Sequence, residues 1–333
     1  MKKFLLTVVA TLIGCFMAAA QTVGVAILTH GDELTAFYGN SALHQAVDAA
    51  VEGDVISLSP GVFKGFETNP LTKSGLTIIG SGMEEGPSRT TLTGFSLRAN
   101  NNSEKFIKLT LKDVYVDYCI WADNGNYELS FSKCNVWQFN CGIAENETST
   151  ITLEDCISCE TNGGTDNFSN CILTAYNCVL KPNLMEGDVS RSRILSNCIL
   201  NVTPSENSHA TITNCIILDG YQYCHLPSGV RATNCKAIVG TTFGGSFLGH
   251  QSFSNESFPA DFEAFTEGTF YELKPELAAT WVDEHGEQIG LYGGPAPFSM
   301  LPNAPRFTKF NVPPRTDEDG KLPVEIEVAF PEK

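Results

Sequence analysis

A short pattern of apolar and polar positions recurs along the middle of the chain. It consists of an apolar residue, any residue, a polar residue, Cys or Val, any residue, and a small or apolar residue. Its seven copies are Leu111–Val116, Phe131–Val136, Leu153–Ser158, Ala175–Leu180, Leu195–Leu200, Ile212–Ile217 and Ala232–Ala237. The fourth positions of successive copies are separated by 20, 22, 22, 20, 17 and 20 residues. A period near 20 indicates a solenoid, in which each repeat buries its apolar face against its neighbours.

Each copy of the pattern reads as two short strands joined by a tight bend. The Cys and the residue two positions later alternate as in a strand, whereas the step of three before the Cys breaks the alternation. A bend at the polar residue repairs the break. Asn stands there in four copies and tolerates left-handed backbone. We therefore predict an all-β fold, a single-stranded parallel β-helix with coils of about 20 residues. An antiparallel β-sandwich with chance Asn-Cys pairs is the alternative.

The regions that flank the repeats are expected to cover the otherwise open ends of the solenoid. The β-helix is expected to span residues 21–240. Within it, a capping helix is predicted over residues 41–51, where one face carries Leu43, Ala46, Val47, Ala50 and Val51. Residues 241–300 are rich in Phe and are expected to form a C-terminal aromatic cap. Residues 301–333 are expected to form a Pro-rich tail with two short strands that pair as a β-hairpin.

The spacing of the cysteines predicts a ladder of thiols rather than disulfides. Equivalent residues in successive coils lie about 4.8 Å apart with parallel Cβ directions, outside the Cβ–Cβ range of about 3.5–4.5 Å that a disulfide prefers. The lone C-x-x-C of Cys156 and Cys159 has no second Cys pair, so we expect no metal site. The predicted inward ladder consists of Cys134, Cys156, Cys178, Cys198, Cys215 and Cys235.

The N-terminus has the pattern of a secretion signal over residues 1–20. Lys2 and Lys3 precede an apolar run that ends in three alanines before Gln21. The run is too short for a confident membrane span, so no transmembrane segment is expected. The expected location is secreted, periplasmic or on the outer cell surface. A rival interpretation is a lipid anchor at Cys15, which ends the lipoprotein-like sequence Leu-Ile-Gly-Cys, although the apolar residues continue past it.

The charge of the chain narrows the class of partner. The formal net charge is −17 and the sequence pI is about 4.7. Nucleic acid is not expected as a partner, because its binding needs clustered Lys and Arg. The same charge disfavours a basic track for a polyanionic glycan across the whole surface, but it leaves a local cleft open. We expect a monomer whose acidic surface mainly provides solubility.

Three segments resemble a known family. Ser41–Ala50 and Gly53–Phe63 resemble the entry to secreted bacterial right-handed parallel β-helix proteins of the pectin-lyase-like superfamily, and the Asn-punctuated coils are similar to theirs. Ile289–Phe298 resembles the closing segment of surface β-helix proteins from gut-type bacteria. The resemblance covers residues 23–298. It implies the fold but no single activity, because such solenoids carry lyases, hydrolases, esterases and non-enzymes.

One function that this resemblance implies is a polysaccharide lyase, which cleaves an acidic uronate glycan by β-elimination. Such a lyase needs an Arg or Lys base, usually with calcium to neutralise the uronate. Arg191 and Arg193 are expected on one face of an extended segment, with Lys181 one coil away. These three residues are the candidate catalytic group, and an ordinary solvated pair of arginines is the alternative.

The other function is the binding of polysaccharide without catalysis. Trp121, Tyr127 and Trp137 would stack on sugar rings if they point outward, and they would be core residues if they point inward. Because the sequence lacks a recognisable catalytic constellation, we favour a binding protein over a lyase. No cofactor is expected for binding, and calcium is expected only for the lyase.

Overall fold

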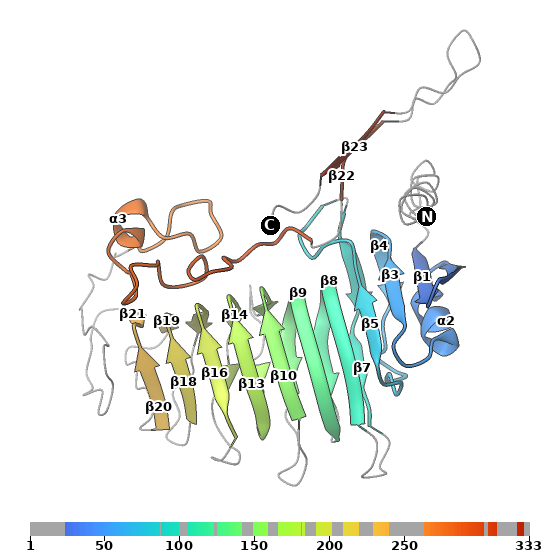
Figure 1. The fold of residues 1–333 in the computed structure, drawn as a ribbon, viewed down its shortest axis with the longest axis horizontal. Helices are drawn as coiled ribbons and strands as arrows, with labels where there is room; N and C mark the ends of the chain where they lie inside the picture. The colour runs from blue at the N-terminus through green and yellow to red at the C-terminus, as the bar shows by residue number, and fades with distance from the viewer. Residues whose placement is uncertain are drawn as a thin grey trace.

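The protein is a parallel β-helix in which the chain winds in stacked coils around one apolar core (Figure 1). This confirms the fold predicted from the repeated pattern. The computed structural model describes residues 24–86, 88–99, 106–122, 125–141, 149–158, 166–180, 182–183, 191–201, 209–219, 229–239, 263–302, 306–311 and 325–329. The expected signal sequence, Cys15 and Lys181 lie outside these described residues.

The strands stack in three parallel columns, and the first column precedes the bend. Two strands are long enough to contribute to all three columns, namely β8 (Phe106–Ala122) and β9 (Asn126–Asn140). The other strands of the first column are β3 (Val55–Leu58), β5 (Leu76–Ile79), β10 (Ser149–Glu154), β13 (Cys171–Tyr176), β16 (Arg193–Ser196), β18 (His209–Thr213) and β20 (Gly229–Thr233).

The second and third columns follow the bend. The second column contains β4 (Gly61–Lys64), β6 (Thr90–Thr93), β11 (Ile157–Ser158), β14 (Val179–Leu180), β17 (Ile199–Asn201), β19 (Ile216–Asp219) and β21 (Lys236–Val239). The third column contains β7 (Phe95–Leu97), β12 (Asp166–Asn167) and β15 (Pro182–Asn183). A coil therefore passes through three faces before it returns one step along the axis.

The bends between the first and second columns have the predicted left-handed backbone. The φ angles lie between 49° and 55° at Asp113, Lys133, Asp155, Asn177, Asn197, Asn214 and Asn234. Asn170 is a second left-handed residue (φ 59°) in the coil that also contains Asn177. The sequence Phe168–Leu173 also matches the repeated pattern, only seven residues before the copy at Ala175–Leu180. Asn170 leads directly into β13, so this additional match does not shift the register of the coils. Left-handed backbone is costly for most residues, which explains the preference for Asn.

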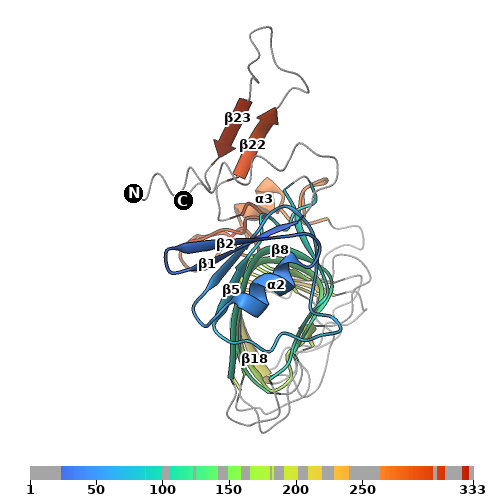
Figure 2. The same cartoon turned by 90° about the vertical axis from the view of Figure 1, so that its right-hand side faces the viewer.

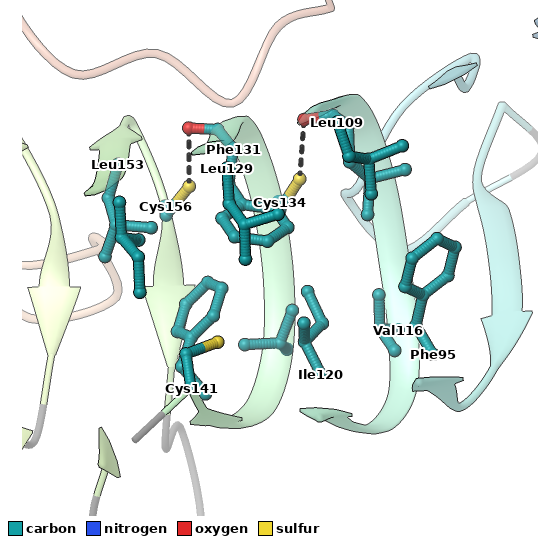
Figure 3. Packing of buried hydrophobic residues seen from close by; sticks show 14 of the residues in the cluster. Phe95, Leu109, Val116, Ile120, Leu129, Phe131, Cys134, Cys141, Leu153 and Cys156 are labelled. Carbon is teal, nitrogen blue, oxygen red and sulfur yellow. Dashed lines mark hydrogen bonds between the residues drawn. The ribbon is translucent and has the colours of Figure 1, made fainter. Parts of the chain in front are cut away.

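The cysteine ladder is confirmed. All six predicted thiols are at most 1% exposed, and the nine cysteines in the described part of the chain are unpaired. Each thiol donates weak hydrogen bonds to backbone carbonyls. Cys156 Sγ, for example, lies 3.5 Å from Phe131 O in the preceding coil (Figure 3). The ladder therefore packs as small apolar side chains beside the Leu and Ile ladders of the core.

The N-terminal end of the core is covered by a helix and a hairpin. Helix α2 (Ala42–Ala49) lies across the opening of the coils (Figure 2) and buries Leu43 and Val47. It is shorter than the predicted 41–51, because Ala50 is extended and the Asp54 carboxylate accepts a hydrogen bond from Val51 N at 2.8 Å. The hairpin consists of β1 (Val25–His30) and β2 (Glu33–Tyr38), and β1 also pairs antiparallel with β3.

The aromatic C-terminal region covers a side of the solenoid, not its end, as far as it is described. Residues 263–302 include the short helix α3 (Pro275–Ala278). Residues 289–302, here called the strap, run along the bends from the late coils to the early coils (Figure 1). The prediction of an end cap is therefore wrong for residues 263–302, because their apolar side chains pack on the outer face of the second column, at Ile157, Val179, Ile199 and Ile216.

The predicted tail hairpin is present. β22 (Arg306–Asn311) and β23 (Glu325–Ala329) pair antiparallel and form a separate two-stranded sheet. The helices of the described residues are all too short to cross a membrane.

Candidate functional site

An open hollow of about 260 Å³ lies on the outer face of the third column. Strands β7 and β8 pair there, with Ser96 opposite Trp121. Their inward neighbours Phe95 and Ile120 are fully buried, so Ser96 and Trp121 project outward by strand alternation. The residues that line the hollow are Glu67, Pro70, Gly94, Phe95, Ser96, Arg98, Tyr118, Cys119 and Trp121.

Two small residues, Gly94 and Cys119, line the hollow. Gly94 has a φ of 78°, and a Cβ atom there would lie 3.2 Å from Glu67 Cβ, so glycine leaves room that other residues would fill. Beside it, Cys119 is nearly buried. Burial, with a smaller contribution from the Glu67 carboxylate, raises the pKa of the Cys119 thiol. This thiol therefore stays protonated at neutral pH and contributes packing rather than nucleophilic chemistry.

Two exposed aromatic side chains, Tyr118 and Trp121, line the hollow, and a third, Trp137, lies next to it against Tyr118. The rings of Tyr118 and Trp137 stack with their centroids 5.3 Å apart and an interplanar angle of 18°. The exposed fractions are 50% for Tyr118, 45% for Trp121 and 39% for Trp137. Large aromatic side chains normally bury most of their surface, so a cluster with this exposure indicates a contact surface.

A β-bulge creates this aromatic cluster. The register of β8 on β9 shifts between Val116 and Cys119, where Asp117 and Tyr118 of β8 face the single residue Trp137 of β9. The extra residue leaves the ladder and places the Tyr118 ring against Trp137. Sequence reasoning missed Tyr118, because only the position of the bulge shows that it lies beside Trp121.

Polar side chains continue the face next to the hollow. Trp121 pairs with Asn140 in the next coil, and Asn140 pairs with Asn167 in the coil after that. Asn167 Nδ2 donates to Asn140 Oδ1 at 3.3 Å. Asn167 Oδ1 also accepts hydrogen bonds from Ser169 N and Oγ. These amides therefore form a linked polar row beside the aromatic rings, with about 4.8 Å between coils.

The three predicted aromatic residues differ in their exposure. Trp121 and Trp137 are exposed and lie at or next to the hollow, as a binding surface requires. Tyr127 is fully buried, and its hydroxyl accepts a hydrogen bond from Ala99 N at 3.0 Å. Its expected contact with sugar is therefore wrong. The sequence contained a signal for this: Tyr127 lies two and four positions before the inward residues Leu129 and Phe131, so strand alternation puts all three on one face.

The predicted basic cluster is not an exposed pair. Arg193 is only 5% exposed, and it pairs with Leu173 in an inward row of β16 and β13. Burial lowers the pKa of its guanidinium. Arg191 is half-buried, and both arginines lower the pKa of the neighbouring Cys171 thiol, although burial still raises that pKa to about 12. The alternative of an ordinary solvated pair of arginines, and the expectation of Arg193 on the coil surface, are therefore both wrong.

The charges at the hollow are balanced and exposed. Glu67 and Arg98 both line it and are accessible, and Arg98 was not predicted from the sequence. Among the described residues, no group of three or more His, Cys, Asp or Glu side chains is placed to hold a metal ion. The chemistry that this arrangement supports directly is stacking and hydrogen bonding to a polar ligand.

Comparison of the chain with family models, curated proteins and solved structures gave no match.

Proposed function

We propose that the protein binds a polysaccharide through the hollow and its three exposed aromatic side chains. The observation that carries the proposal is the grouping of Tyr118, Trp121 and Trp137 on one outer face. Sugar rings combine apolar C–H faces with hydroxyl groups. Aromatic rings match the former, and the charged and amide side chains nearby match the latter. The fit is to the chemistry of a glycan in general, and it names no particular sugar.

We further propose that this binding takes place outside the cytoplasm, in the secreted, periplasmic or surface-attached state. The support is the basic and apolar pattern of residues 1–20, together with the Cys15 alternative for a lipid anchor. Mass spectrometry of the mature protein tests it. An N-terminus at Gln21 supports cleavage, a lipid on Cys15 supports the anchor, and an intact Met1 contradicts both.

The binding proposal is tested with Trp fluorescence. The chain contains three Trp residues, and Trp281 is buried where the C-terminal region packs on the second column, while Trp121 and Trp137 are exposed. Soluble xylan, galactan and polygalacturonate are titrated into the purified mature protein. We expect at least one of them to change the fluorescence. A matching result from affinity electrophoresis would exclude an optical artefact.

Two substitutions locate the binding. Trp121→Ala is expected to weaken the affinity about tenfold, because removal of a central aromatic contact usually costs more than 1 kcal/mol. Tyr176→Ala is the matched control, since Tyr176 is a similarly exposed aromatic residue, on β13. Equal affinities of all three proteins would place the binding elsewhere, and no binding to any polymer would overturn the proposal.

An ultraviolet assay separates binding from cleavage. A uronate lyase generates an unsaturated product, so absorbance is followed with polygalacturonate in the presence and absence of calcium. We expect no rise in absorbance. A rise that Arg98→Ala abolishes would make the hollow a lyase site. A rise that only Arg191→Ala abolishes would restore the basic residues predicted from the sequence.

A further inference from the structure

Strand β2 presents an open edge at the N-terminal end of the solenoid. It is paired with β1 on one side, and no other strand among the described residues pairs with its second side. All of its side chains are exposed except the half-buried Phe37. An exposed strand edge carries a row of backbone donors and acceptors that can template another strand.

The hydrogen-bond phase of the hairpin shows which groups point outward. Gly39 N donates to Gly24 O at 2.8 Å, one step beyond the pair of Val25 and Tyr38. In an antiparallel ladder, hydrogen-bonded and non-hydrogen-bonded pairs alternate. The bonds to β1 therefore fall at Phe37, Thr35 and Glu33, while Leu34 and Ala36 direct their N–H and C=O groups to the open edge.

The side chains on this edge are self-complementary. Leu34, Ala36 and Tyr38 share one face of β2 by alternation, and Leu34 and Tyr38 are 37% and 44% exposed. If two copies of β2 pair antiparallel about Ala36, each Leu34 lies opposite Tyr38 of the second copy. The small Ala36 side chains meet at the centre. Aromatic and aliphatic cross-strand pairs of this kind are favourable.

We propose that β2 is a dimerisation edge that pairs antiparallel with β2 of a second copy, centred on Ala36. This register brings the outward backbone groups of Ala36 into a reciprocal pair of hydrogen bonds. It also keeps the carboxylates of Glu33 apart, because each lies opposite Gly39 of the second copy. The dimer replaces the monomer expected from the sequence. It joins two solenoids end to end, so that two glycan-binding faces act together and gain avidity.

The two-stranded contact is small, and each chain carries a net charge of −17, so the dimer is expected to be weak and salt-dependent. Sedimentation equilibrium of the mature chain from about 1 μM to about 1 mM measures it. We expect a reversible dimer that is strengthened at high salt. Leu34→Lys and Ala36→Pro are expected to weaken it at least tenfold. Ala36→Pro removes only an outward N–H group and spares the bonds to β1.

Val62→Lys is the matched control, because Val62 is an exposed apolar residue on β4. It should leave the association unchanged. A monomer over the whole concentration range overturns the proposal. So does a dimer whose affinity Leu34→Lys leaves unchanged.

Cysteine crosslinking tests the register independently of affinity. Two Ala36 Cα atoms in the proposed pair lie about 5.5 Å apart, within the disulfide range of roughly 4.4–6.8 Å. Ala36→Cys is therefore expected to form a covalent dimer under mild oxidation. Thr35→Cys is not expected to crosslink. The two residues at position 35 are separated by about 6.8 Å along the strands in addition to the spacing between the strands. The oxidised wild-type protein gives the background. Crosslinking of Thr35→Cys alone would overturn the register.

Discussion

The early and late bends of the solenoid share one backbone but differ in chemistry. Lys133 and Asp155 in the early coils and Asn197 and Asn214 in the late coils all have φ angles between 51° and 54°. The late bends carry neutral amides, whereas the early bends carry opposite charges that are almost completely buried. The bend thus requires left-handed backbone, but this requirement does not decide which residue occupies the position.

The strap explains why both chemistries are tolerated. In the late coils, Asn177 Nδ2 donates to Ala296 O, and Asn214 Nδ2 donates to the Asp283 carboxylate at 3.2 Å. In the early coils, Lys133 Nζ donates to Leu301 O at 2.6 Å and lies 3.8 Å from the Asp155 carboxylate. The side chains of Asn177, Asn214 and Lys133 therefore all bond to the C-terminal region. The early pair adds a buried charge interaction that depends on both Lys133 and Asp155.

Breaking that pair should have the largest effect. Lys133→Asn keeps a residue suited to left-handed backbone but leaves the Asp155 carboxylate buried without its cation. We expect a loss of about 3–5 kcal/mol in the free energy of unfolding at pH 8, measured by denaturant titration. Lys112→Asn, one residue before the Asp113 bend, is the control and should change stability by less than about 0.5 kcal/mol. Equal stabilities of the two variants would show that the early bends tolerate isolated charge.

The pH dependence of stability tests the acidic member of the same pair, Asp155. Burial raises the pKa of Asp155 to about 7 from 3.8, against the opposing effect of Lys133. The folded protein therefore holds a proton that the unfolded chain releases, so stability falls as the pH rises from about 4 to 7. The slope is up to about 1.4 kcal/mol per pH unit. Asp155→Asn should remove this contribution and make the early bend resemble the late ones. The same dependence of stability on pH in the wild-type protein and in Asp155→Asn would contradict the assignment of this slope to Asp155.

A clash between the strap and a late bend should have a smaller effect. A Cβ atom on Gly294 would lie 2.3 Å from Asn197 Nδ2, whereas a Cβ on Gly286 meets nothing within 4 Å, and both glycines have φ angles near 80°. Both alanine variants carry the left-handed penalty of about 1–2 kcal/mol. Gly294→Ala should cost about 1–2 kcal/mol more, as measured by thermal unfolding. An equal loss in both variants would mean that the strap does not press on the bend.

The smallest effect should come from the late bend itself. Asn197→Ala forces a β-carbon into left-handed backbone, whereas Asn197→Gly does not, and both variants remove the amide. We expect the alanine variant to be less stable than the glycine variant by about 1 kcal/mol. Guanidinium titrations of the two variants measure this difference. If alanine were the more stable, the backbone requirement shared by early and late bends would be disproved.

The fold could be predicted because its information is local and repeated. The polar residue before each Cys marks a bend, and the Cys itself marks an inward position, so the same sequence signal occurs in every coil. The strap could not be predicted in this way. Its contact with Lys133 joins residues 168 positions apart, and its residues carry no period that would reveal a partner. The Phe-rich composition indicated a covering segment but not the surface that it covers.

The candidate site was predicted only in part. Trp121 and Trp137 could be named from their residue type, but whether an aromatic residue points outward depends on the register of its strand. The alternation with Leu129 and Phe131 was sufficient to place Tyr127 inside. Tyr118 depends on a bulge of one residue, whereas Gly94 comes from the preceding coil and Glu67 from the coil before that. A hollow built from neighbouring coils leaves no continuous motif in the sequence.

The strap also has a consequence for how the protein is made. Solenoids generally add stability coil by coil, so that early coils can fold while later ones are still being synthesised. Here the early bend at Lys133 gains its partner only when Leu301 has left the ribosome. The buried charges of Lys133 and Asp155 therefore lack this last partner until nearly the whole chain has been synthesised. The central coils therefore reach their full stability only near the end of synthesis, whereas a solenoid without such a strap would reach it coil by coil.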